Sequence, residues 1–337
     1  MKKNMISMAI LSLAFFVSAC SSSSSNGGSG DTVELKLGTK MPGDSPEGKG
    51  FEIFADLVDE KSDGELEINL YPNEQLGEGT TQIDNMLSGT QDMYADGAAY
   101  FDDFDSRLAV SSVPYLFKDF DHFQKFNTGE MGQDIQEELI SQGVRFINDE
   151  RTFVRGPYRV LVSDEPIESV EDLEGLKIRS FESEYYSDAY KSVGANPTVI
   201  AWTETYLGLQ QGQVDAATSP IAQVWPMKFT EVAPYMTVID EYPQDIVIAM
   251  DEDKYQELSD EHKEILTEAA NEAGEKASEE LEDTVEEHME KMKEEHDIEV
   301  FEIDDEKWSE AFSDYHYQLE EDGTVPEGYI DDIKSIE

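Results

Sequence analysis

Alternating hydrophobic and polar residues predict short strands in the first part of the chain. Residues 33–37 alternate, and so does the segment 66–71, which Pro72 ends. Successive side chains of a strand point to opposite faces, so this pattern is typical of a strand with one buried face. Helical spacing of the apolar residues predicts a helix over 51–61, and the glycines and prolines of 38–50 predict a loop. This order of elements predicts an α/β domain with a largely parallel sheet.

Helical and strand-like patterns continue to alternate as far as residue 217. We expect helices over 80–87, 117–140, 185–193 and 203–211, and short strands from Met93 and over 144–147, 160–162, 176–179, 198–200 and 214–217. These segments predict a second α/β run. A chain of 337 residues is long enough for two domains with cores of their own.

Residues 253–295 are very acidic, yet their apolar residues recur at helical spacing, which predicts a long helical region with one buried face. The expected buried stripe comprises Leu258, Ile265, Leu266, Ala269 and Ala273. A last helix is expected over 308–319.

The charge balance changes the range of possible partners. The chain has 24 Lys and Arg against 76 Asp and Glu, a formal net charge of −52. Such a surface repels nucleic acid and anionic lipid headgroups, so we expect neither as a partner. Dense carboxylates also repel one another, and salt screens that repulsion. We therefore predict a protein adapted to a salty (halophilic) setting, although any acidic extracellular protein could share this composition.

The N-terminus has the features of an export signal. Lys2 and Lys3 provide a positive start, and residues 6–17 form an apolar run too short for a comfortable transmembrane helix. The run ends in Val-Ser-Ala-Cys at 17–20, which resembles a bacterial lipobox. We predict a lipoprotein signal peptide over 1–20, with ordinary cleavage after residue 19 as the alternative.

Cys20 is the only cysteine, so the chain can form no internal disulfide. The lipobox resemblance implies that this residue is lipidated and becomes the first mature residue. The Ser, Gly and Asn residues of 21–30 predict a flexible tether. We therefore expect a protein held at the cell membrane by a lipid anchor, facing the outside or the periplasm.

Several ordered motifs resemble one family of binding proteins. They are Tyr71-Pro-Asn-Glu-Gln-Leu-Gly77, Gly89-Thr-Gln-Asp92, Pro114-Tyr-Leu-Phe117, Asp172-Leu-Glu-Gly-Leu-Lys-Ile-Arg179, Gly194-Ala-Asn-Pro-Thr198, Ala201-Trp-Thr-Glu-Thr-Tyr206, Leu209-Gln-Gln-Gly-Gln-Val-Asp215 and Lys228-Phe-Thr-Glu-Val232. Over residues 31–320 the chain resembles the solute-binding proteins of tripartite ATP-independent periplasmic (TRAP) transporters, of the DctP type.

The resemblance implies a two-lobed α/β fold like that of periplasmic binding proteins. Each lobe is a sheet flanked by helices, and crossing strands and a long helix link the lobes around a ligand cleft. By the family outline, lobe 1 comprises 31–156 plus 245–284, and lobe 2 comprises 157–244 plus 285–337.

The resemblance also implies a carboxylate-binding site. Arg179 stands where the family has its key arginine, whose planar fork matches a carboxylate; the alternative is a surface ion pair. Arg159, 20 residues earlier, matches a second family arginine. Trp202 stands where the family places an aromatic wall, although it could belong to the core. Ser219 departs from the asparagine that is common there and can donate only one hydrogen bond.

Lobe 1 is expected to set ligand specificity. By position, the cleft residues are Lys40, Gly79, Asp96, Gly97 and Tyr100, together with Glu182 of lobe 2. Gly97 and Tyr100 stand where sialic-acid binders have an acidic residue and an arginine, which argues against sialic acid. Asp96 could accept from a ligand hydroxyl or ammonium, and Lys40 could bind a second carboxylate. Each could equally be a loop residue.

No catalytic motif accompanies these residues. The chain has no His-Glu-x-x-His pattern, no nucleophile elbow and no phosphate loop, so we expect a binding protein without cofactor or metal rather than an enzyme. We predict a monomer that captures a small organic carboxylate and delivers it to TRAP membrane permease subunits. A lipoprotein serving a receptor or another transporter is the alternative. Dicarboxylates, sugar acids, keto acids and zwitterions all stay open as ligands.

Overall fold

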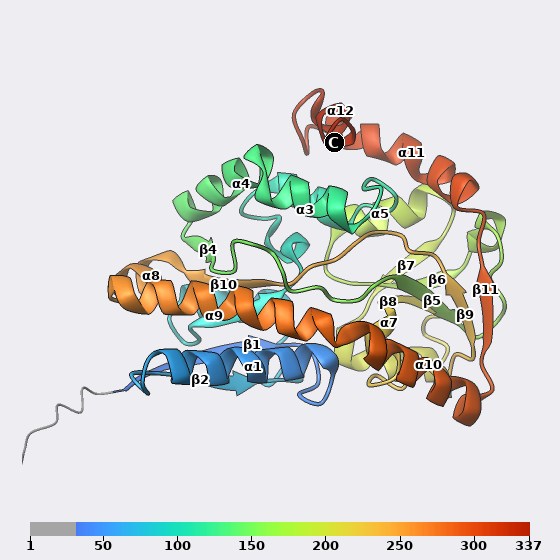
Figure 1. Ribbon diagram of the computed structural model, residues 1–337. Coiled ribbons are helices and arrows are strands. Elements are labelled where there is room, and N and C mark those ends of the chain that lie inside the picture. Colours follow the sequence, from blue (N-terminus) through green and yellow to red (C-terminus); the bar gives the residue numbers. More distant parts are fainter. Residues whose placement is uncertain (1–31) are drawn as a thin grey trace, which may run out of the picture. The chain divides into compact units, whose positions relative to one another are not determined.

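The computed structural model describes residues 32–337, which form two β-sheets with helices packed against them (Figure 1). The predicted signal peptide (1–20), the lipidation site Cys20 and the predicted tether (21–30) lie outside the described residues and stay predictions. From residue 32 onward, no helix combines the length and the apolar character needed to cross a bilayer.

The first sheet has five strands in the order β2-β1-β3-β10-β4. They are β1 (Val33–Thr39), β2 (Leu66–Tyr71), β3 (Met93–Asp96), β4 (Val144–Phe146) and β10 (Val247–Asp251). The helices that pack near this sheet are α1 (Pro46–Lys61), α2 (Gly79–Leu87), α3 (Phe120–Thr128), α4 (Glu130–Ser141), α8 (Glu252–Glu257) and α9 (Asp260–Glu279). The register places Leu35 beside Ile68, and both side chains are buried, as the alternation predicts.

The second sheet has six strands in the order β11-β9-β5-β8-β6-β7. They are β5 (Arg159–Ser163), β6 (Lys177–Ser180), β7 (Asn196–Val199), β8 (Ala216–Pro220), β9 (Tyr235–Val238) and β11 (Glu299–Glu302). The helices of this part are α5 (Glu184–Ser192), α6 (Thr205–Gln210), α7 (Ile221–Val224), α10 (Leu281–His296), α11 (Asp305–Glu321) and α12 (Tyr329–Lys334).

The expected parallel pairing is confirmed for β1 with β2 and with β3, whereas one strand of each sheet runs antiparallel to its neighbours. In the first sheet β10 runs antiparallel to β3 and β4, and in the second sheet β5 runs antiparallel to β8 and β9. Both strands continue from segments that cross between the sheets. Each of these strands enters its sheet from the crossing segment, and this fixes the direction in which the strand runs. Alternation of apolar and polar residues gives no information about strand direction.

Two expected boundaries are also wrong. The segment 38–50 is not all loop, because α1 begins at Pro46. The Ser45 hydroxyl accepts a hydrogen bond from the backbone N–H of Gly48 at 3.0 Å, and proline is well tolerated in the first turn of a helix. The helix over 308–319 is not the last, because α12 follows it.

Strand β10 was not predicted because Val247 to Met250 are all buried and show no alternation.

Two extended segments and a long helical region link the sheets. Val154 and Asp245 form an antiparallel bridge, the N–H of Arg155 donates to the carbonyl of Gln244 at 3.0 Å, and the N–H of Ile246 donates to that of Phe153 at 2.9 Å. Helix α9 lies beside α1, and α10, which follows α9 directly, packs against α7 (Figure 1). The predicted stripe of this region is buried apart from a partly buried Ile265.

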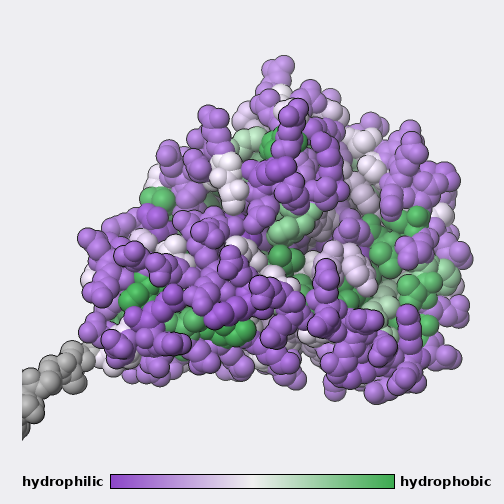
Figure 2. All heavy atoms as spheres, viewed as in Figure 1, coloured by the Kyte–Doolittle hydropathy of each residue, from purple (hydrophilic) through white to green (hydrophobic). Residues whose placement is uncertain are grey.

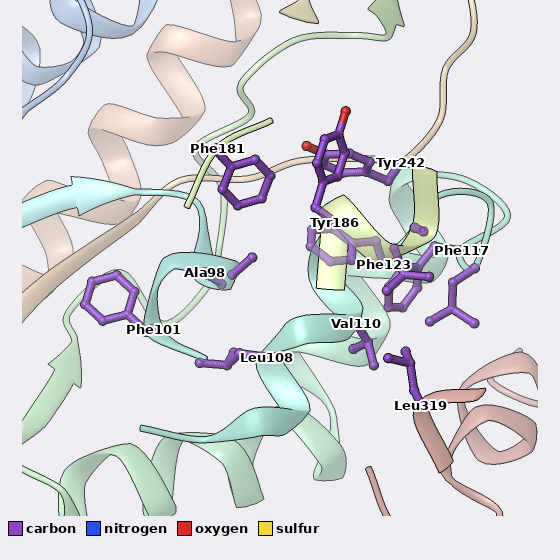
Figure 3. Close-up of a cluster of buried hydrophobic side chains, with 14 of the residues drawn as sticks. Ala98, Phe101, Leu108, Val110, Phe117, Phe123, Phe181, Tyr186, Tyr242 and Leu319 are labelled. Carbon is purple, nitrogen blue, oxygen red and sulfur yellow. The ribbon is translucent and has the colours of Figure 1, made fainter. Parts of the chain in front are cut away.

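One hydrophobic cluster contains side chains from both sides of the crossing segments. Figure 3 shows Phe101 and Leu108, which follow β3, in the same cluster as Phe181, Tyr186 and Tyr242. Helix α12 also joins this cluster, and the ring Nε2 of His122 in α3 lies 2.8 Å from the carbonyl of Ile333. The cluster therefore packs the sheet of β3 against the elements that follow β6.

Close packing of α9 against the first crossing segment predicts that Gly274→Ala destabilises the protein. A Cβ at Gly274 would lie 2.8 Å from the backbone nitrogen of Phe153 and 2.5 Å from the hydroxyl of Thr152. We expect a loss of about 1–3 kcal/mol from overpacking, although alanine favours helix more than glycine does. Urea unfolding measures this loss. Glu275→Ala, at an exposed position of the same helix, is the control and should change stability by less than about 0.5 kcal/mol; equal stability of the two variants would contradict the prediction.

Candidate functional site

Two adjoining cavities, of about 190 Å³ and about 30 Å³, lie between residues of the first sheet's side and residues of the second. We call them together the cleft. Five residues line both cavities: Lys40, Tyr100, Arg179, Phe181 and Trp202. The cleft is therefore centred on one arginine, one lysine and three aromatic side chains.

Four of these residues lie at or just after the C-terminal ends of strands. Lys40 follows the end of β1, Tyr100 follows β3, Arg179 lies near the end of β6, and Trp202 follows β7. Strands β1 and β3 pair in parallel, and so do β6 and β7. Ligands of α/β sheets bind beyond the carboxyl ends of parallel strands, where loops free of sheet pairing project side chains. The cleft lies at such ends of both sheets.

Arg179 is buried with only 7% of its surface exposed. Its Nε donates to the carbonyl of Ile200 at 3.0 Å, and its guanidinium carbon lies 5.3 Å from the centre of the Trp202 ring. Within residues 32–337, no carboxylate lies at ion-pair distance from this guanidinium. The surface ion pair considered as an alternative for Arg179 is therefore absent from the described part of the chain.

A buried ionic network forms the wall beside Arg179. The Arg155 guanidinium donates to both oxygens of Glu47, at 2.9 and 2.8 Å, and to Asp96 at 2.6 Å. The other Asp96 oxygen lies 2.8 Å from Lys40 Nζ, which also donates to the Tyr100 hydroxyl at 2.7 Å. Each of these charges has a partner, which buried ions require.

Burial and pairing shift the ionisation of this network. Burial lowers the pKa of Lys40 to about 8, although the Asp96 carboxylate opposes the shift. Burial disfavours ionisation of Asp96, but Lys40 and Arg155 outweigh it and hold the pKa of this carboxyl at about 2. At neutral pH the wall therefore contains an ionised carboxylate facing a lysine that is close to titration.

Arg159 lies deeper, where it lines only the smaller cavity of the cleft. Its guanidinium donates to Glu241 at 3.0 Å, to the Gln244 side chain at 2.9 Å and to the Thr218 hydroxyl at 3.1 Å, and it lies 4.2 Å from the centre of the Tyr242 ring. This arginine joins β5 to the returning crossing segment, and its charge already has a partner.

Contacts between the two sides involve four residues that line the larger cavity: Glu74, Tyr100, Phe181 and Glu182. The Thr80 hydroxyl of α2 donates to Glu182 at 3.1 Å, and the Thr203 hydroxyl donates to Glu74. The rings of Tyr100 and Phe181 lie 5.1 Å apart. These contacts join residues more than 80 positions apart in sequence and hold the two sides together around the cleft.

The structure brings together six of the eight residues predicted to bind ligand. Lys40, Tyr100, Arg179 and Trp202 line both cavities, Glu182 lines the larger one, and Arg159 lines the smaller one. Asp96 and Ser219 line neither cavity: both are fully buried, Asp96 behind Lys40 and Ser219 with its hydroxyl on the carbonyl of Pro220 at 2.9 Å. All eight assignments as ligand-binding residues stay predictions.

Sequence reasoning gave no role to Arg155 or Glu47, which hold the network together. Their positions lie 108 residues apart, and neither belongs to a motif that singles it out. The acidic residues Glu74, Glu78 and Glu204, which also line the larger cavity, were not predicted either. In so acidic a chain these glutamates look like any others, so only the folded structure identifies them.

Comparisons with known proteins agree with this architecture. The model of the family described as bacterial extracellular solute-binding protein, family 7 (DctP), matches residues 37–322. The 2,3-diketo-L-gulonate-binding periplasmic protein YiaO of Escherichia coli is 30% identical over 258 residues, which cover 77% of this chain and 78% of the relative. The expectation of a binding protein rather than an enzyme is confirmed by this family.

Two crystal structures show the same fold. A TRAP periplasmic solute-binding protein of Ochrobacterium anthropi with bound L-fuconate has a TM-score of 0.84 and 25% identity, covering 90% of this chain and 99% of that one. A TRAP solute-binding protein of Sulfurospirillum deleyianum with bound succinate has a TM-score of 0.81 and 25% identity, with the same coverage. The predicted two-lobed α/β fold is thus confirmed, and the chain belongs to the DctP family of TRAP transporter solute-binding proteins.

Proposed function

We propose that this protein captures a small organic carboxylate in the cleft, with Arg179 as its anchor, and delivers it to a TRAP membrane permease. The observation that carries the proposal is the buried Arg179 guanidinium, which has no carboxylate partner within residues 32–337. The relatives support it, because 2,3-diketo-L-gulonate, L-fuconate and succinate all carry a carboxylate.

A ligand carboxylate would supply the charge that Arg179 lacks. A buried cation without a counterion is costly, and a carboxylate can accept two parallel hydrogen bonds from a guanidinium. The interaction strengthens as the cleft excludes water, because the effective dielectric constant falls. The indole ring of Trp202 lies 5.3 Å from the same guanidinium and helps to hold the guanidinium in its orientation. The indole also provides an apolar wall for the ligand.

Closure of two lobes around the ligand completes the proposed cycle. The division into 31–156 plus 245–284 and 157–244 plus 285–337 is supported by the Val154–Asp245 bridge, which lies at both boundaries. Ligand shifts the population towards the closed form through contacts that only this form makes. The closed protein then docks on the permease, while a lipid on Cys20 and the tether 21–30 keep it near the membrane.

Thermal unfolding with a panel of small carboxylates tests the proposal, and an Arg179 variant tests the anchor. A ligand at about 1,000 times its Kd should add about 4 kcal/mol of stability. Arg179→Ala should weaken binding by about 2–5 kcal/mol, because truncating one partner of a buried charge pair leaves the other unpaired.

Arg179→Lys should recover part of this loss, since it restores charge without the planar fork. Arg145→Ala is the matched control, because Arg145 pairs with Glu252 outside the cleft. An Arg179→Ala protein that is folded and binds with an unchanged Kd would rule out Arg179 as the anchor. A panel without any stabilising carboxylate would rule out the proposed function.

The lowered pKa of Lys40 predicts that the affinity for a carboxylate ligand falls in mildly alkaline solution. The pKa of Lys40 is lowered to about 8 by burial, so the unliganded protein loses this positive charge as the pH rises through 8. A bound anion favours the protonated lysine, and affinity should therefore decrease up to about tenfold between pH 7 and 9. Isothermal titration calorimetry at constant ionic strength measures this decrease. The Lys40→Gln protein should show a flatter profile, and equal profiles would contradict the prediction.

The acidic surface predicts that salt stabilises the fold. The net charge is −52, and hydrophilic residues cover most of the face shown in Figure 2, with small hydrophobic patches between them. The screening length falls from about 10 Å at 0.1 M salt to about 3 Å at 1 M, which weakens repulsion between exposed carboxylates. We expect the midpoint of thermal unfolding to rise over this range. Sucrose at matched osmolality controls for general solute effects, and a midpoint that salt does not raise would contradict the adaptation to salt.

A further inference from the structure

Among the described residues, the buried cations of the cleft include one, Arg179, that has no carboxylate partner. Four cationic side chains line the two cavities, and three of them are paired with carboxylates. The pairs are Lys40 with Asp96, Arg155 with Glu47 and Asp96, and Arg159 with Glu241. These four cations face three carboxylates, because Asp96 serves two of them. The remaining cation, Arg179, has no carboxylate partner within residues 32–337. One carboxylate of a ligand would therefore balance its charge.

Lys40 is poorly placed to bind a second ligand carboxylate. Its ammonium group contacts Asp96 at 2.8 Å and the Tyr100 hydroxyl at 2.7 Å, and it lies 4.1 Å from the centre of the Tyr100 ring. Binding a ligand carboxylate here would place it beside Asp96, which is fully buried and already ionised at neutral pH. Like charges at such distances in a buried site repel strongly.

The larger cavity continues from Arg179 into an acidic region. Four glutamates line it: Glu74, Glu78, Glu182 and Glu204. Glu74 is half-buried, and burial raises its pKa above the usual range. Carboxylate oxygens accept hydrogen bonds from hydroxyl groups, as Glu74 and Glu182 already do from two threonines, but they repel another carboxylate.

We propose that the cleft selects organic acids that carry one carboxylate and several hydroxyl groups, and discriminates against dicarboxylates. The carboxylate binds Arg179, and the hydroxyl groups extend into the acidic region and donate to its glutamates. This inference rests on the proposed function, since it takes Arg179 as the anchor. It narrows the ligand from any small carboxylate to a monoanionic hydroxy acid.

Two matched pairs of ligands test the inference by isothermal titration calorimetry at pH 7 and constant ionic strength. D-Gluconate and D-glucarate share a six-carbon hydroxylated chain, but D-glucarate ends in a second carboxylate. Succinamate and succinate differ only by an amide in place of one carboxylate. We expect the dianion of each pair to bind at least about tenfold more weakly, and D-gluconate to bind more tightly than succinamate, which lacks hydroxyl groups.

Removing negative charge from the acidic region should reduce the discrimination. In the double variant Glu78→Gln/Glu204→Gln, the ratio of the Kd of D-glucarate to that of D-gluconate should fall at least about threefold. Glu261→Gln, at an exposed position of α9 outside the cleft, is the matched control and should leave the ratio unchanged.

The outcomes separate this inference from the proposed function. A dicarboxylate that binds as tightly as its monoanionic partner, or more tightly, overturns the inference but leaves carboxylate capture by Arg179 intact. A ratio that the double variant leaves unchanged overturns the role of the acidic region. Absence of binding by these four acids and by every other carboxylate of the thermal panel overturns the proposed function, and the inference with it.

Discussion

The cleft depends on the buried ion pairs that Arg155 makes with Glu47 and Asp96. Arg155 belongs to the first crossing segment, Glu47 to the first turn of α1 and Asp96 to the end of β3, so one guanidinium connects three elements. Removing one member of such a network leaves an uncompensated buried charge, which costs about 3–5 kcal/mol. The same carboxylate of Asp96 positions Lys40, so the network that joins the crossing segment to the first sheet also fixes a wall of the cleft.

The arginines of the cleft differ in whether their charge has a carboxylate partner, a difference that the sequence alone does not show. Arg155 and Arg159 have carboxylate partners and fasten the crossing segments to the sheets. The guanidinium of Arg179 is oriented by Ile200 and Trp202 and has no carboxylate partner in the described part of the chain. A side chain that is oriented before binding loses less conformational entropy when a ligand binds. In the proposed function, the charge of Arg179 is free to be matched by a ligand, whereas the charges of Arg155 and Arg159 are already matched within the protein.

Sequence patterns predicted the elements whose physical causes are local. The strand at 33–37 alternates. The cleft positions of Arg179 and Trp202 were implied by the resemblance to the family rather than by a local pattern, and the structure places both residues at the cleft. The first turn of α1 was missed although Ser45 caps it, because the glycines around it favour a loop. Strand direction and the partnership of Arg155 with Glu47, 108 residues apart, result from tertiary packing. No local pattern encodes them, so they could not be predicted.

The negative surface and the anion-binding cleft impose opposite demands that salt can reconcile. A net charge of −52 repels an approaching carboxylate and slows its association at low ionic strength. Salt screens exposed charges strongly but affects a buried contact much less. Salt that stabilises the fold would therefore speed the approach of the anion while leaving its contact with Arg179 nearly intact. In this protein the surface would govern the rate of capture, and the buried charge balance would govern which acid is kept.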